Sequence, residues 1–183
     1  MKLNGDKSKL VILSRKRKKL NENLCILLFN DVVRPVSRAK ILGIEIDSTL
    51  RFKNHIQDLA LRAEKRLNML RILAWGWTEP KTLIRLYKVF IRSIFENVSI
   101  SFLHCPDSAL EGMQKVQNKA LRTSLRLPRY VSLKLLHESA RLLTVKERLI
   151  QLGTSLVARM TQNNPHIRNI VEQVRIHEAN SRV

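Results

Sequence analysis

Two basic amphipathic segments between Thr78 and Pro128 constrain the fold of this chain most strongly. The first segment carries four cations at steps of four, three and four residues, which we call the first stripe: Lys81, Arg85, Lys88 and Arg92. The second stripe has the same spacing: Lys115, Lys119, Arg122 and Arg126. At about 100° per residue, each set falls within one narrow sector of a helix, and apolar residues fill the other faces. We therefore predict two helices, each with an apolar back and a cationic front.

The cationic fronts favour contact with a polyanion. Each stripe covers about 16 Å at ~1.5 Å per residue, a length that spans several phosphates of a nucleic acid backbone. We expect neither stripe to be interleaved with acidic residues that would form i,i+4 pairs. The alternative is a solvated helix face that is basic without binding anything, which is the usual explanation of a charge run.

The overall charge also favours an anionic partner. The chain has 34 Lys and Arg against 15 Asp and Glu, a net charge of +19 over 183 residues. Nucleic acid most commonly relieves such self-repulsion, and an anionic membrane surface is the rival partner. No apolar run approaches the ~18 residues of a membrane-spanning helix. The charged N-terminus lacks a secretory signal region, so we expect an intracellular protein, nuclear or cytoplasmic, that is not secreted.

The apolar patterning predicts an α+β fold that is mostly α. Strands are expected over residues 9–14, 24–29, 32–36 and 41–46, forming a small N-terminal antiparallel sheet in which Gly43 marks a bulge or a close backbone approach. A bundle of about five helices follows, with 44% hydrophobic residues to fill its core. The first of these helices has an apolar side at close to i, i+4, i+7 spacing: Phe52, Ile56, Leu59, Ala60, Ala63, Leu67, Leu70 and Leu73 or Ala74. We expect an N-cap at Thr78 before Pro80, and further helices from Ser132, Thr144 and Ile167. The predicted domains are a β-rich segment at 1–50, a helical domain at 51–162 and a weak C-terminal helix or tail at 163–183.

A basic cluster at residues 15–19 follows the first predicted strand. It is open to three interpretations: a solvated loop, a nuclear-localisation signal or a phosphate contact.

The residues that catalysis or metal binding requires are not grouped in the sequence. No two aspartates are adjacent, and Glu45 with Asp47 is better explained as strand surface than as a metal site. Cys25 and Cys105 form no Cys-x-x-Cys pair. We therefore predict no catalytic residues, no metal site and no cofactor in this chain. A stand-alone nuclease is the enzyme alternative.

Several short motifs follow one another from about residue 3 to 150. The first are Leu3-Asn4 with Lys7-Ser8, and Ile41-Leu42-Gly43-Ile44 with Asp47 and Leu50. Four more come after them: Ala63-x-x-Arg66-Leu67-Asn68-x-Leu70, Leu86-Tyr87-Lys88-x-Phe90-x-Arg92, Val116-Gln117-Asn118-Lys119-Ala120-Leu121-Arg122 and Leu136-His137-Glu138. In this order the motifs resemble the end of the palm, the primer grip, and the thumb and adjoining region of reverse transcriptases from non-LTR retrotransposons of the jockey and CR1 kind. Leu3-Asn4 with Lys7-Ser8 resembles the Leu-Asn-x-x-Lys-Thr/Ser segment of that palm.

The resemblance implies roles for individual residues. Lys7 would lie near the phosphates of the incoming nucleotide, Leu42 and Gly43 would approach the primer end, and the thumb helices would hold an RNA–DNA hybrid or duplex. The paired aspartates of the family, which hold Mg²⁺ in a complete polymerase, lie upstream of the matched region. We therefore expect a reverse transcriptase (RNA-directed DNA polymerase) fragment that is inactive alone and whose partners include the upstream palm and fingers of the same polyprotein.

Two other interpretations remain open. One is a domesticated or unrelated basic helical protein that binds nucleic acid without a polymerase context. The other is a helical module that binds a membrane surface or another protein.

Overall fold

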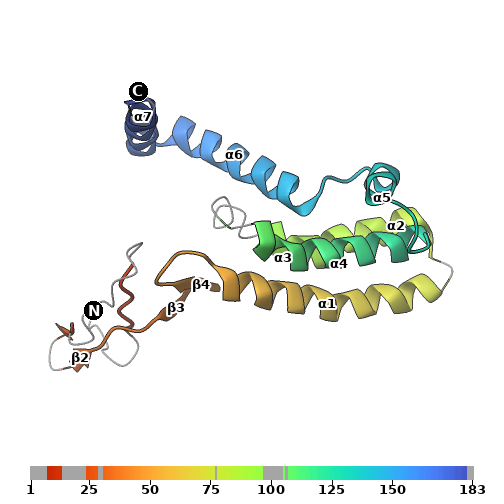
Figure 1. The fold of residues 1–183 in the computed structure, drawn as a ribbon, viewed down its shortest axis with the longest axis horizontal. Helices are drawn as coiled ribbons and strands as arrows, with labels where there is room; N and C mark the ends of the chain where they lie inside the picture. Colours follow the sequence, from red (N-terminus) through yellow and green to blue (C-terminus); the bar gives the residue numbers. More distant parts are fainter. Residues whose placement is uncertain are drawn as a thin grey trace.

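The computed structural model describes residues 8–13, 24–28, 31–76, 78–96, 105 and 107–180. Lys7 and the basic cluster at 15–19 lie outside these residues. The described part is mostly helical, with short antiparallel strands near the N-terminus, which confirms the predicted α+β, mostly α class (Figure 1).

The strands form two separate hairpins instead of the single small sheet that we predicted. β1 (Ile26–Leu28) pairs with β2 (Asp31–Val33), and β3 (Arg38–Ile41) pairs with β4 (Ile44–Asp47). Of the strand expected at 9–14, the described residues form only an isolated parallel bridge between Leu10 and Pro35.

Gly43 is part of a turn, so the prediction of one bulged strand over 41–46 is wrong. Leu42 and Gly43 both have positive φ, 50° and 87°, and Ile41 pairs with Ile44 across them. Positive φ at both central residues is typical of the type I′ turn, a two-residue hairpin loop whose backbone twist matches that of the flanking strands. Glycine meets this need without steric cost. Leu42 is left at the hairpin tip, 99% exposed.

α1 (Lys53–Trp75) begins just after β4. The carboxylate of Asp47 precedes it and accepts hydrogen bonds from the backbone N–H groups of Thr49, Arg51 and Phe52. Partial burial would raise the pKa of Asp47, but these bonds and that of the Thr49 hydroxyl lower it below its usual value. The predicted apolar side of the helix is confirmed, since its central members are buried: Ile56, Leu59, Ala63, Leu67 and Leu70.

Thr78 closes α1 and does not cap the next helix as predicted. Its hydroxyl donates to the carbonyl of Leu73, 2.9 Å away, while Glu79 is the N-cap residue and Pro80 the first residue of α2. Proline fits this position because the first N–H of a helix has no partner within it.

α2 (Pro80–Leu86), the π-helical η1 (Tyr87–Arg92) and α3 (Ser93–Glu96) form one continuous rod. Its buried residues recur at every fourth position: Leu83, Tyr87, Ile91 and Phe95. In a regular α-helix each step of four advances by about 40°, so this row would drift by about 120° around the rod. A π turn takes in an extra residue and cancels most of that drift. All four side chains therefore face the core.

α4 (Asp107–Leu125) completes the core against α1 and the α2–η1–α3 rod. Figure 1 shows that α1 and α4 run in the same direction and that the rod runs the opposite way. The predicted apolar back of α4 is confirmed, since all of its members are buried: Leu110, Met113, Val116, Ala120, Leu121 and Ser124.

Three further helices follow: α5 (Leu133–Ala140), α6 (Val145–Asn163) and α7 (Pro165–Asn180). The predicted starts at Ser132 and Thr144 are confirmed, since both side chains accept a backbone N–H at the helix N-terminus. Thr144 also forms a reciprocal capping box with Glu147. In Figure 1, α6 leads away from the bundle toward α7.

Candidate nucleic-acid interface

Two adjoining hollows lie between α1 and α4. The first has a volume of about 890 Å³ and involves the N-terminal halves of both helices. The second, of about 720 Å³, extends to the C-terminal ends of α1 and α4 and the start of α5. Lys115 and Lys119 line both hollows. We call the pair the α1/α4 groove.

Small residues keep the first hollow open. Ala60 of α1 and Ala109 and Gly112 of α4 line it. A Cβ atom placed on Gly112 would lie 3.4 Å from the Cβ of Ala60, so the two helices approach closely here. A long apolar side chain at either position would fill the hollow.

Basic residues outnumber acidic residues in the lining of the groove. In the first hollow four cations accompany two acids, Glu64 and Glu111. No described residue that lines the second hollow is acidic, and five are basic: Arg71, Lys115, Lys119, Arg122 and Arg129. The excess of basic over acidic lining residues is therefore greatest toward the C-terminal end of α4. Three cations of the groove are members of the predicted second stripe, and the other four, Arg51, Lys53, Arg71 and Arg129, come from outside the stripe.

Two ion pairs involve the second stripe, and the expectation that it would form no i,i+4 pair with an acidic residue is wrong for Lys115. Lys115 lies 3.9 Å from Glu111, one turn earlier on α4, and Lys119 pairs with Glu64 of α1. The hydrogen bond and charge of Lys119 lower the pKa of Glu64. About half of each side chain in the Lys119–Glu64 pair is exposed, so water screens the attraction and it contributes little stability.

The two arginines of the second stripe differ from its lysines in position. Arg122 donates to the carbonyl of Val131 at 2.9 Å and so ties the turn after α4 to the helix. Arg126 lies beyond the last residue of α4 and has a φ of 55°, so it has left the helical face on which we placed it.

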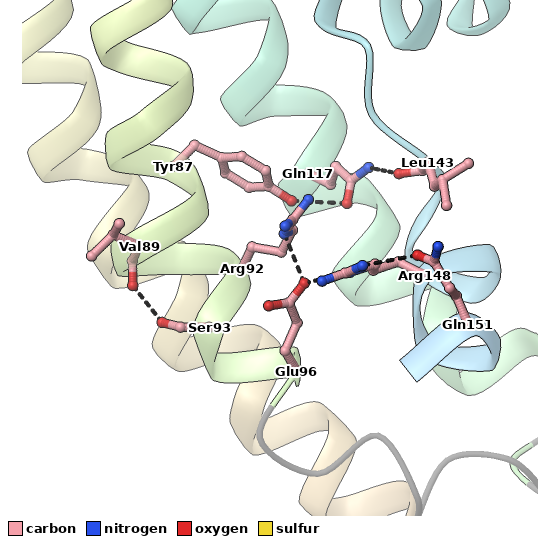
Figure 2. A network of polar contacts seen from close by, with 9 residues as sticks. All are labelled: Tyr87, Val89, Arg92, Ser93, Glu96, Gln117, Leu143, Arg148 and Gln151. Atoms are coloured by element: carbon pink, nitrogen blue, oxygen red, sulfur yellow. Dashed lines mark hydrogen bonds and ion pairs between the residues drawn. The ribbon is translucent and has the colours of Figure 1, made fainter. Parts of the chain in front are cut away.

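The first stripe does not reach the groove. Lys81 and Arg85 are exposed on α2, Lys88 is half-buried on η1, and no member of this stripe lines either hollow. Arg92 is turned toward α6, and its Nε lies 2.9 Å from Glu96 Oε1 in an ion pair (Figure 2). The same oxygen accepts a hydrogen bond from Arg148 Nε at 2.8 Å. Glu96, four residues after Arg92, is the i,i+4 partner that we did not expect.

A buried polar chain lies beside this cluster and was missed by the sequence analysis (Figure 2). The Tyr87 hydroxyl donates to Gln117 Oε1, and Gln117 Nε2 donates to the carbonyl of Leu143, both at 2.8 Å. Burial raises the pKa of Tyr87 well above its usual value, so the hydroxyl stays protonated and can donate. The spacing of Gln117 from Leu110 and Met113, seven and four residues, was the available signal that it faces the core.

Leu42 and Gly43, the predicted primer contacts, lie at the tip of the β3–β4 hairpin, and neither lines the α1/α4 groove. Lys7 lies outside the described residues.

Two features are absent from the described residues. In this part of the chain no three His, Cys, Asp or Glu side chains are grouped so that they could hold a metal ion. None of the helices combines the length and the apolar character needed to cross a bilayer.

Comparisons with protein-family models, with curated proteins and with solved structures give no match to this chain.

Proposed function

We propose that the α1/α4 groove binds the phosphate backbone of a nucleic acid duplex. The observation that carries this proposal is the second hollow, where five cations from α1, α4 and the following turn line one concave surface, with no acid among its described residues. Cations on several elements can contact several phosphates at once, and each contact releases condensed counterions.

The length of the groove suits several nucleotides of a nucleic acid backbone. Residues from Lys53 to Arg71 line its α1 side, a distance of about 27 Å at ~1.5 Å per residue. At about 3.4 Å between phosphates along one strand, this length matches roughly eight nucleotides. Lysine and arginine contacts to phosphate are independent of sequence, so the binding would be non-specific.

The polymerase context of this binding is part of the same proposal. The resemblance to the thumb of retrotransposon reverse transcriptases covers α1, the α2–η1–α3 rod and α4, and it favours an RNA–DNA hybrid as the bound duplex. The chain alone would not polymerise, since the aspartates that hold Mg²⁺ in that family lie upstream of the matched region. An in-frame palm with paired aspartates upstream of Met1 in the genome would support this context, and an unrelated frame would oppose it.

Titration of a labelled RNA–DNA hybrid at several salt concentrations tests the binding. The logarithm of affinity should fall with the logarithm of salt by about 0.9 per phosphate contact, and replacing Lys119 or Arg122 by Ala should reduce that slope by about one unit each. An affinity that does not change with salt would refute the proposal. Liposome binding that survives competition by duplex would favour a membrane surface instead.

A further inference from the structure

Two large aromatic side chains stand in solvent where the α1/α4 groove ends. Trp75, the last residue of α1, is 90% exposed, and Tyr130, in the turn after α4, is 89% exposed. Neither ring contributes to the core at these exposures. Exposed aromatic rings beside a polar site are a common feature of binding surfaces.

Both aromatics are next to cations of the second hollow. Trp75 comes four residues after Arg71 on α1, and residues at this spacing are neighbours on one helix face. Tyr130 follows Arg129 and precedes Val131, whose carbonyl holds Arg122. Figure 1 shows that α1 and α4 finish at the same end of the bundle. The two rings therefore stand at the most cationic end of the groove.

This combination matches the chemistry of an unpaired nucleic acid strand. Proteins that bind single strands hold the phosphates with cations and stack the exposed base faces on aromatic side chains. The bases inside a duplex are already stacked on each other and cannot use such rings. Lys115 and Lys119 have acidic partners within the chain, but no ion pair with another described residue neutralises Arg71, Arg122 or Arg129. An uncharged apolar partner would leave these three cations without anions, so charge complementarity favours a nucleic acid strand.

We propose that Trp75 and Tyr130 stack on bases of the unpaired strand that continues from the duplex at the C-terminal end of the α1/α4 groove. The proposal rests on the proposed function, since the duplex places the strand there. Arg71 and Arg129 would hold the phosphates of this strand, and Trp75 and Tyr130 its bases.

The test compares a blunt RNA–DNA hybrid with the same hybrid carrying a short unpaired tail, in the DNA strand or in the RNA strand. For the unchanged protein, a tail on one of the strands should raise affinity by roughly 5- to 150-fold for each base stacked. Trp75→Ala and Tyr130→Ala should each remove part of this gain and leave affinity for the blunt hybrid unchanged. Trp75→Phe should retain most of it, because a ring remains.

Phe90→Ala is the matched control, since Phe90 is an exposed aromatic, 50% exposed, that lines neither hollow. It should leave the gain from the tail intact. Fluorescence gives a second readout: with Trp77→Phe as the background, Trp75 is the one remaining tryptophan of the chain, and the tailed hybrid should quench its emission more than the blunt one.

Three outcomes would overturn the inference. If the blunt hybrid binds with the expected salt dependence but neither tail adds affinity, stacking is refuted and the duplex proposal stands. If a tail adds affinity that survives both alanine variants, the strand lies elsewhere. If neither hybrid binds, both proposals fail.

Discussion

The two basic stripes share one spacing in the sequence and have different structural roles. The second stripe lies mainly on the regular helix α4 and lines a groove, whereas the first crosses from α2 into the π-helical η1 and ends in an ion-pair cluster with α6. The π turn keeps Leu83, Tyr87, Ile91 and Phe95 buried and also rotates Arg92 toward the core side. A charge pattern therefore predicts a common face only where the helix keeps its ordinary period.

This difference predicts that charge removal in the two stripes has unequal effects on binding. Lys115→Gln with Arg122→Gln should reduce the affinity for a duplex by roughly 60-fold at 0.1 M salt, because the loss of two contacts lowers the log-log slope by about 1.8. Lys81→Gln with Arg85→Gln removes the same charge from exposed positions outside the groove and should have a much smaller effect. Fluorescence anisotropy with one hybrid measures both. Equal losses of affinity in the two double variants would show that the stripes do not differ in their contribution to binding.

The end of the first stripe should matter for stability and not for binding. Glu96→Gln leaves two half-buried arginines, Arg92 and Arg148, without their shared carboxylate. We expect this substitution to lower the free energy of unfolding, measured by urea denaturation, by about 1–3 kcal/mol and to leave the affinity for a duplex unchanged.

Asp58→Asn is the control for this change, since the pair of Asp58 with Arg62 is about half exposed. It should alter stability by less than about 1 kcal/mol. A weaker duplex affinity in Glu96→Gln at full stability would assign the first stripe a role in binding.

The start of α6 positions Arg148 for this cluster, so its capping box offers a smaller test. Thr144→Ala should lower the free energy of unfolding by about 1 kcal/mol, as measured by thermal unfolding. Hydrogen bonds from the backbone and hydroxyl of Thr144 lower the pKa of Glu147. The contribution of these hydrogen bonds to the free energy of unfolding is therefore present above the ordinary glutamate pKa near ~4.3. It is lost as pH falls through the lowered pKa that Glu147 has in the folded state. The stability difference between Thr144→Ala and the unchanged protein should shrink over that acidic range, and a constant difference would contradict this explanation.

The smallest expected effect concerns Glu64, one of the two acidic residues that line the first hollow. Glu64→Gln removes a negative charge from the first hollow and releases Lys119 for phosphate, so affinity should rise by a few-fold. The pair of exposed side chains contributes about 0.2–1 kcal/mol, so unfolding should change little. Unchanged or weaker binding of the hybrid in anisotropy would indicate that Lys119 does not contact the duplex.

Periodicity predicted α1 and α4 well because their burial follows the ordinary helical period of 3.6 residues. The apolar sides of α1 and α4 and the caps Ser132 and Thr144 were all expected and are confirmed. The turn at Leu42–Gly43 was mistaken for a bulge, because a glycine between two apolar pairs fits both a kinked strand and a tight hairpin.

The candidate site was only partly predictable. Lys115, Lys119 and Arg122 follow from the pattern on α4, but their neighbours Arg71 and Arg129 come from other segments and meet them only through packing. Glu64 pairs with Lys119 across 55 positions of sequence, which no local pattern reveals. The π turn that redirects Arg92 responds to the packing of four buried side chains, and the charge spacing carries no sign of it.

Protection of lysines from acetylation, measured by mass spectrometry with and without an RNA–DNA hybrid, tests the central claim most directly. The account predicts that the hybrid protects Lys53, Lys115 and Lys119 of the groove and leaves Lys81 and Lys88 as reactive as before. Protection of Lys81 and Lys88 equal to that of Lys115 would contradict it.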